Sequence, residues 1–208
     1  PESYYTPPAE GLEEIQIIRG AASLQYGTQF GGLINFKLKR PDPIKPFTFI
    51  TRNTLGSNNL LTNFSMASGT LDKFRYIGFV NLKKGDGFRP NSNFNSSNIF
   101  VQIGYDFSED TFVAAEVTYL DYLTQQAGGL SDIMFDENPY QSNRSRNWFV
   151  LSWILYNIKF QHSFNTDSNL SLNLFGLDIY MISKIGINLN LIFFLARIKM
   201  LLFLLPSK

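Results

Sequence analysis

Apolar and polar residues alternate with a period of two through most of the chain between residues 47 and 179. This pattern is typical of antiparallel strands whose two faces lie in different surroundings. It predicts seven strands, over residues 47–56, 59–69, 73–84, 97–108, 111–123, 147–164 and 169–179. The fourth is the clearest, with Ile99, Val101, Ile103, Tyr105 and Phe107 on one face and Phe100, Gln102, Gly104, Asp106 and Ser108 on the other.

The connections between these strands alternate in length. Short turns lie near residues 69–72, 108–110 and 165–168, whereas the segments 85–96 and 124–146 are long and polar. Only the first connection, 56–58, would be short on the long-loop side. Membrane barrels combine short turns on one side with long loops on the other. The pattern therefore favours an antiparallel transmembrane β-barrel with its apolar face toward lipid, over a soluble sandwich, in which alternation also occurs.

Residues 1–42 have a different character. The segment Leu12–Gly20 predicts a short strand, Ala21–Gly27 has helix-compatible residues for one or two turns, and Leu33–Lys39 predicts a second strand. Gly31 and Gly32 precede that second strand and permit a tight bend. We expect a small folded unit ahead of the barrel strands. Pro1 stands where an initiating Met would be, so we expect the chain to begin within a longer protein.

The composition limits the kinds of functional site that the chain can form. The 208 residues carry a net charge of +1, so no overall field points to nucleic acid. The chain has no Cys and a single histidine, His162, which excludes thiolate sites and multi-histidine metal sites. No arrangement of serine, histidine and carboxylate residues in the sequence suggests a catalytic triad. The acidic residues Asp132, Asp136 and Glu137 lack the spacing of a calcium loop. We expect no enzyme activity, cofactor or metal. The 20 Phe and 10 Tyr suit aromatic girdles, and we place Trp148 and Trp153 at the interface or toward lipid.

The last segment, 181–208, breaks the alternation with nearly unbroken apolar runs. A membrane helix would bury Arg197 and Lys199 in hydrocarbon, which is costly. A barrel strand would lack a polar face, so we expect neither. The narrow vocabulary of Ile, Leu, Phe, Lys and Asn suggests frame-shifted or read-through translation, and we expect the barrel sequence to stop near Asp178.

One motif is specific. The segment from Glu13 through Arg19-Gly20 to Tyr26-Gly27, continuing with Gly31-Gly32 and Leu33-Ile34-Asn35, resembles the closing motif of the plug domain of TonB-dependent outer-membrane receptors. The resemblance implies structural roles for Glu14, Arg19, Gly20, Tyr26, Gly27, Gly31, Gly32 and Asn35. It also implies an α+β plug inside a barrel of about 22 strands, of which this chain would hold about seven.

A second resemblance concerns the longest loop. Leu123-Thr124-Gln125-Gln126-Ala127-Gly128-Gly129-Leu130, Asn138-Pro139 and the run from Ser142 to Phe149 resemble the iron(III) dicitrate transporter-like branch of these receptors. The resemblance implies a ferric chelate as ligand, with Gln125, Gln126, Arg144 and Arg146 as candidate contacts. A solvated loop with ordinary basic residues is the competing interpretation for each of them.

The family resemblance also implies the setting. It predicts active import across a bacterial outer membrane, with lipid around the barrel and the TonB energy-transducing complex acting through an N-terminal segment outside this chain. Residues 1–42 would end the plug, residues 43–180 would begin the barrel, and residues 181–208 would be the atypical tail. Import of glycans or cobalamin, and a structural or adhesive barrel without transport, are the alternatives.

Overall fold

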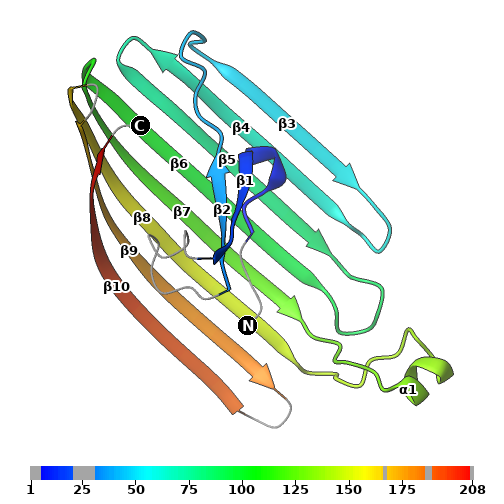
Figure 1. Cartoon of the computed structure of the whole chain (residues 1–208). Coiled ribbons are helices and arrows are strands. Elements are labelled where there is room, and N and C mark those ends of the chain that lie inside the picture. The colour runs from blue at the N-terminus through cyan, green and yellow to red at the C-terminus, as the bar shows by residue number, and fades with distance from the viewer. Residues whose placement is uncertain (1–5, 21–30, 166–167, 186–188, 207–208) are drawn as a thin grey trace.

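The computed structural model describes residues 6–20, 31–165, 168–185 and 189–206 (Figure 1). A 3-10 helix at Ala9–Gly11 leads into an antiparallel pair of strands, β1 (Leu12–Ile18) and β2 (Leu33–Leu38). An eight-stranded antiparallel sheet follows, in the order β10-β9-β8-β7-β6-β5-β4-β3. Its strands are β3 (Thr48–Leu55), β4 (Leu61–Leu71), β5 (Phe74–Gly85), β6 (Phe94–Ser108), β7 (Thr111–Gln125), β8 (Trp148–Asn165), β9 (Ser168–Ile185) and β10 (Leu189–Pro206).

Each strand of the large sheet pairs with its neighbour in the chain, so the topology is a simple up-and-down meander. The first six predicted strands match β3 to β8 to within three residues at either end. Two-residue turns join β4 to β5 and β6 to β7 at one edge of the sheet, and β8 ends and β9 begins at the same edge. The long connections 86–93 and 126–147 both lie at the opposite edge, as the alternation of loop lengths predicted.

The tail differs from expectation. Strand β9 runs past Asp178 to Ile185, and Leu189–Pro206 forms an eighth strand that pairs with β9 along its whole length. The expectation that this segment would not form a strand is therefore wrong. The physical reason is that pairing to a neighbouring strand satisfies the backbone groups of β10 whatever side chains it carries.

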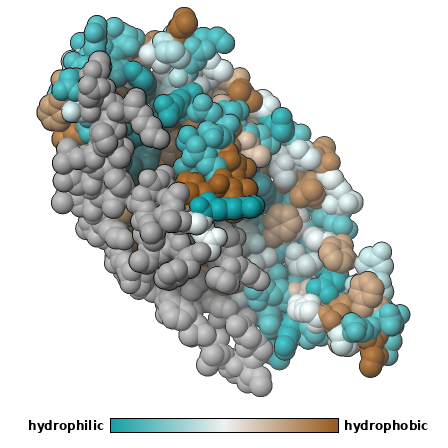
Figure 2. Space-filling view, in the orientation of Figure 1, coloured by the Kyte–Doolittle hydropathy of each residue, from teal (hydrophilic) through white to brown (hydrophobic). Residues whose placement is uncertain are grey.

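The two faces of the sheet differ sharply. We call the face that carries the β1–β2 hairpin the inner face and the opposite one the outer face (Figure 1; Figure 2 shows the hairpin side as a space-filling view). Phe64, Met66, Ile77, Phe79 and Phe100 form a buried cluster on the inner face, and Leu38 of β2 packs against it. On the outer face of β6, Ile99, Val101, Ile103 and Tyr105 are 37% to 47% exposed. The predicted division of faces in this strand is confirmed.

A second buried cluster corrects the expectation for Trp153. This side chain is buried with Leu120, Phe149 and Leu151, so it does not face outward as the sequence suggested. The register explains the placement, because Trp153 pairs with Leu120 while its exposed neighbour Ile154 pairs with Tyr119. Successive side chains in a strand point to opposite faces.

The longest loop contains a short helix, α1 (Asp132–Glu137), that the sequence pattern did not predict. Ser131 is its N-cap, and its side chain accepts a hydrogen bond from the backbone N–H of Met134. A serine ahead of an acidic first turn is a signal for a helix start. None of the helices in the described chain has the length and apolar character needed to cross a membrane.

The segment between the hairpin and β3 is fastened to the short-turn edge of the sheet. The Thr70 hydroxyl donates to the Asp42 carbonyl at 2.9 Å, and the Tyr76 hydroxyl donates to the Pro46 carbonyl at 2.9 Å. Gly69 makes this crossing possible, because a Cβ there would overlap the Pro46 carbonyl. The sheet edge therefore fixes where the chain passes from the hairpin into β3.

Candidate functional site

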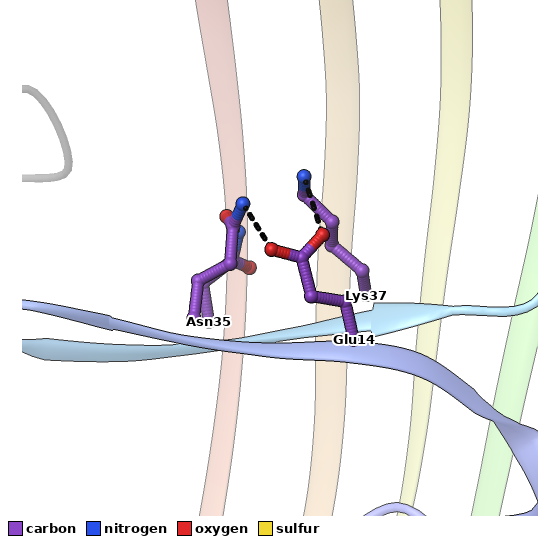
Figure 3. Close-up of polar contacts among 4 residues, drawn as sticks. Glu14, Asn35 and Lys37 are labelled. Atoms are coloured by element: carbon purple, nitrogen blue, oxygen red, sulfur yellow. Dashed lines mark hydrogen bonds and ion pairs between the residues drawn. The ribbon is translucent and has the colours of Figure 1, made fainter.

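The hairpin presents one polar face built from cross-strand neighbours. Gln16 lies opposite Asn35 and Glu14 opposite Lys37. The Asn35 amide donates to Gln16 Oε1 at 3.0 Å, and Gln16 donates to Glu14 Oε1 at 3.0 Å. Lys37 Nζ completes the row with an ion pair to Glu14 Oε2 at 3.2 Å (Figure 3). Two residues expected to be structural, Glu14 and Asn35, thus belong to one hydrogen-bonded row.

Glu14 is the electrostatic centre of this row. Its hydrogen bond from Gln16 lowers the pKa of the carboxyl below the usual 4.5, and the hydrogen bond and charge of Lys37 lower it further. The carboxylate is therefore held in its charged form. Among the described residues, its hydrogen-bond partners are Gln16 and Lys37, and Arg19 of the same motif is exposed.

Two glycines of the motif, Gly20 and Gly32, occupy positions that need glycine. Gly20 has φ +69° and Gly32 has φ +98°, both in the left-handed region. A Cβ at Gly32 would also lie 2.6 Å from the Ile18 carbonyl oxygen, so the close approach of β1 to the start of β2 requires glycine. Gly31 is exposed with open space around its Cα. Tyr26, Gly27 and the expected helical turns of 21–27 lie outside the described residues.

Three contacts seat the hairpin and the 3-10 helix on the inner face. Leu38 packs on the buried cluster, and a Cβ at Gly11 would lie 3.2 Å from the Phe79 ring, so the backbone there rests on the ring. Glu10 Oε1 pairs with Arg52 Nη1 of β3 at 3.1 Å. Apolar packing and one ion pair therefore join the two parts of the chain.

The inner wall carries a polar row across three strands. Glu116 of β7 accepts hydrogen bonds from Gln102 of β6 and Asn157 of β8, both at 2.8 Å. Nearer the short-turn edge, Arg75 Nε pairs with Asp106 Oδ2 at 2.6 Å, and its guanidinium lies over the Phe112 ring. The polar positions predicted for one face of β6 thus form specific contacts on the inner face.

A cavity of about 1200 Å³ separates the hairpin from this wall. Lys37, Lys39 and Arg40 line it from the hairpin side, and Glu116 and Lys159 line it from the wall. Charges of both signs border the cavity, so it offers polar contacts without a strong preference for one sign.

The four predicted ligand contacts lie at the two ends of the longest loop, 126–147. Gln125 ends β7, Gln126 follows it, and the exposed Arg144 and Arg146 precede β8. The Gln126 N–H donates to the Asn147 carbonyl at 3.0 Å, which draws the two ends of the loop together. The structure therefore brings all four residues to one rim of the sheet, at the end away from the short turns.

Sequence reasoning missed the contacts that hold this loop. Asn91, from the neighbouring loop 86–93, donates to the carbonyls of Gln126 at 2.9 Å and Asn147 at 3.0 Å. Arg89 Nη2 donates to the Gly128 carbonyl at 2.7 Å. Side chain to backbone bonds leave no periodic pattern in a sequence. The only signal was a cluster of polar and turn-forming residues in 86–96.

No three His, Cys, Asp or Glu side chains within the described ranges lie close enough together to hold a metal ion. This holds for Asp132, Asp136 and Glu137 around α1. The four candidate ligand contacts at the rim are instead two side-chain amides and two guanidinium groups, which can donate hydrogen bonds. Such groups recognise anions and carboxylates.

Only the comparison with solved structures found a protein similar to this chain. No protein-family model matches the sequence, and no curated protein matches it. Among solved structures, the chain is similar to the crystal structure of the ferric citrate transporter FecA in its unliganded form. The TM-score is 0.71 at 20% sequence identity, and the match covers 83% of this chain and 27% of the transporter. The chain therefore has the fold of a segment of a ferric citrate transporter.

Proposed function

We propose that this chain is part of a TonB-dependent outer-membrane receptor that imports a ferric chelate. The observation that carries the proposal is the combination of a polar hairpin with the plug motif, seated on the inner face of an antiparallel sheet with long loops at one edge. The similarity to a ferric citrate transporter supports the same function. In this proposal the loops bind the chelate, and the TonB complex, acting through a segment outside this chain, moves the plug to open a path.

The outer face supports a place in a membrane. In the middle of β6, β7 and β8 its exposed side chains are apolar or aromatic, among them Val101, Ile103, Val117, Ile154 and Ile158, whereas the exposed polar residues Asn95 and Asp121 lie nearer the long-loop edge. Near the short-turn edge, exposed or half-buried aromatic rings gather in the contacting pairs Phe74 with Tyr76 and Tyr105 with Phe107. An apolar band bordered by an aromatic girdle is what lipid selects on a barrel.

The division of the chain follows from this function. We propose that residues 1–42 end the plug and residues 43–180 supply barrel strands. The frame-shift hypothesis for 181–208 stays a prediction, although its backbone continues the sheet. Resequencing the coding DNA tests it, because an intact reading frame whose relatives share this tail would contradict it.

The chelate is proposed from the donors at the rim. Arg144 and Arg146 are exposed, and the side-chain amide of Gln126 makes no described contact, so these groups are available to a carboxylate ligand. Guanidinium groups bind carboxylates with two parallel hydrogen bonds. Ferric dicitrate or another anionic iron chelate fits that chemistry better than neutral glycans or cobalamin.

The experiment uses the full-length receptor that contains this chain. Cells expressing it should take up radiolabelled ferric citrate, and uptake should stop when TonB is removed. Growth on a glycan with no iron phenotype would favour the glycan importer. Binding without any dependence on TonB would favour a structural or adhesive barrel.

Variants locate the binding residues. Arg144→Ala combined with Arg146→Ala should weaken ferric citrate binding at least tenfold, since a charged hydrogen bond contributes about 1.5–3 kcal/mol. Lys84→Ala is the matched control, because Lys84 is an exposed cation near the same rim but on the outer face. Equal losses in both variants would show that general surface charge, and not a site, controls binding.

A further inference from the structure

The loop 86–93, which we call the bracing loop, contacts the longest loop through three side chain to backbone hydrogen bonds. The two donors, Arg89 and Asn91, are not among the candidate ligand contacts. Both lie in one loop, and their acceptors are the carbonyls of Gln126, Gly128 and Asn147. The contacts therefore run in one direction, from bracing loop side chains to the backbone of the longest loop.

Asn91 closes the base of the longest loop. Its single amide nitrogen reaches two carbonyls that belong to opposite ends of that loop, Gln126 and Asn147. Asn91 itself has φ +56°, a left-handed conformation that asparagine tolerates better than most residues. The position therefore needs both an amide donor and a residue that accepts this backbone geometry.

Arg89 fixes the first arm of the longest loop. Its guanidinium bonds the carbonyl of Gly128, where φ is +78° and where a Cβ would overlap the Asn143 side chain. Asn143 in turn donates to the Gly129 carbonyl, and Ser142 donates to the Ala127 carbonyl at 3.0 Å. These hydrogen bonds therefore join the two sides of the longest loop, one of which carries Gln126 and the other Arg144.

The bracing loop is itself anchored. The Asp86 N–H donates to the Asn58 carbonyl at 2.9 Å, and the Asp86 carboxylate accepts from Asn59 and Asn93. Asn93 meets β7 directly, since its carbonyl accepts from the Gln125 N–H at 2.8 Å. The loops after β3, β5 and β7 therefore form one hydrogen-bonded unit.

We propose that Arg89 and Asn91 are positioning residues that hold Gln125, Gln126, Arg144 and Arg146 in their ligand-binding arrangement before the chelate arrives. The inference rests on the proposed function, because it concerns the same binding rim. Neither residue needs to touch the ligand. The affinity is higher because the loop is already ordered in the free protein, so binding does not have to supply the free energy needed to order it.

Asn91→Gly tests the proposal with little risk to folding, because glycine accepts the left-handed backbone and removes only the amide. In the full-length receptor it should weaken ferric citrate binding about tenfold and speed hydrogen exchange of the Gln126 amide. Asp72→Gly is the matched control. It likewise places glycine at a left-handed position, φ +51°, but in the short turn between β4 and β5 at the opposite edge of the sheet, and should leave both measurements within about twofold of the unchanged receptor.

Arg89 supplies an independent test. Arg89→Met keeps much of the side-chain length but no donor and should weaken binding, while Arg89→Lys, which retains a charged donor, should recover most of the affinity. A double variant separates positioning from contact. If Asn91→Gly and Arg144→Ala each lower the affinity about tenfold, the double variant should lose clearly less than a hundredfold in affinity, because both changes act on the same loop.

The outcomes distinguish this inference from the function on which it rests. If the unchanged receptor does not bind ferric citrate, the proposed function fails, and exchange at Gln126 still decides whether Asn91 orders the loop. If the receptor binds and Asn91→Gly binds equally well, Asn91 is not a positioning residue. Fully multiplicative losses in the double variant would also overturn the proposal.

Discussion

Glu10 and Arg52 form an ion pair, 3.1 Å between Oε1 and Nη1, that links the segment ahead of the hairpin to the first strand of the large sheet. The two residues are 42 positions apart in the sequence. Arg52 is largely exposed, so solvent screens the pair. The pair therefore orients the 3-10 helix against β3, and most of the stabilisation at this contact comes from the apolar packing beside it.

Breaking this pair should cost little. Arg52→Ala should lower the free energy of unfolding by less than about 1 kcal/mol, and the loss should shrink in high salt. Chemical denaturation at two salt concentrations measures it. Exchanging the charges, with Glu10→Arg and Arg52→Glu together, should recover part of the loss. A cost of several kcal/mol that salt does not change would contradict this description.

Gly69→Ala should be far more damaging. The new Cβ would overlap the Pro46 carbonyl, which also accepts the Tyr76 hydroxyl, so the connecting segment must leave the sheet edge. A loss of about 2 kcal/mol or more is expected from such a backbone clash. Gly129→Ala, where nothing lies within 4 Å of the new atom, is the control. Thermal unfolding of the two variants should differ clearly.

Glu116 should stabilise the fold by accepting hydrogen bonds from two side-chain amides. Glu116→Leu would remove the acceptor of both Gln102 and Asn157 on the inner wall. Each unsatisfied donor costs about 1–3 kcal/mol if water cannot replace the carboxylate. Replacing all three side chains by apolar residues should recover much of that loss. Denaturation of the single and triple variants measures both effects, and equal stability of Glu116→Leu and the unchanged receptor would refute the role.

Acid should loosen the hairpin through Glu14. Because the folded hairpin lowers the pKa of Glu14, the unfolded chain binds the proton more tightly at this group. Its stabilising contribution is therefore complete above the usual value of 4.5 and is lost as pH falls through the lowered folded value. Hydrogen exchange of hairpin amides should accelerate across that window. In Glu14→Gln this pH-dependent part should disappear.

A charged residue introduced on the outer face should destabilise the protein more, the deeper the residue lies in the bilayer. Val101→Arg lies near the middle of β6 and should cost about 2–4 kcal/mol in a bilayer if this face meets lipid. Ser97→Arg, on the same face closer to the long-loop rim, should cost about 1 kcal/mol or less. Unfolding from lipid vesicles compares the two. Equal costs at both depths would argue against a membrane.

Much of the fold was predictable because strand periodicity and turn residues are local signals. The alternation in β6 identified its outer face, and short turns such as Asp72–Lys73 identified one edge of the sheet. The strand β10 was not predictable, because an apolar run carries no period and its register is set only by β9. The inward place of Trp153 likewise depended on the register of β8 against β7.

The candidate site was predictable only in part. The sequence placed Gln125 and Arg144 near one loop, and the structure confirms that both lie at the same rim. It gave no sign of Asn91, whose role depends on carbonyls 35 and 56 positions away. Whether the rim binds a chelate stays a prediction for the uptake experiment.

The order of strands in the large sheet has one practical consequence. Within the described chain, β3 and β10 each pair with a neighbour on one side only, and β10 is 18 residues long. The backbone donors and acceptors along such margins attract any other extended chain. A recombinant protein consisting of these 208 residues alone should therefore form oligomers or aggregates through its margins.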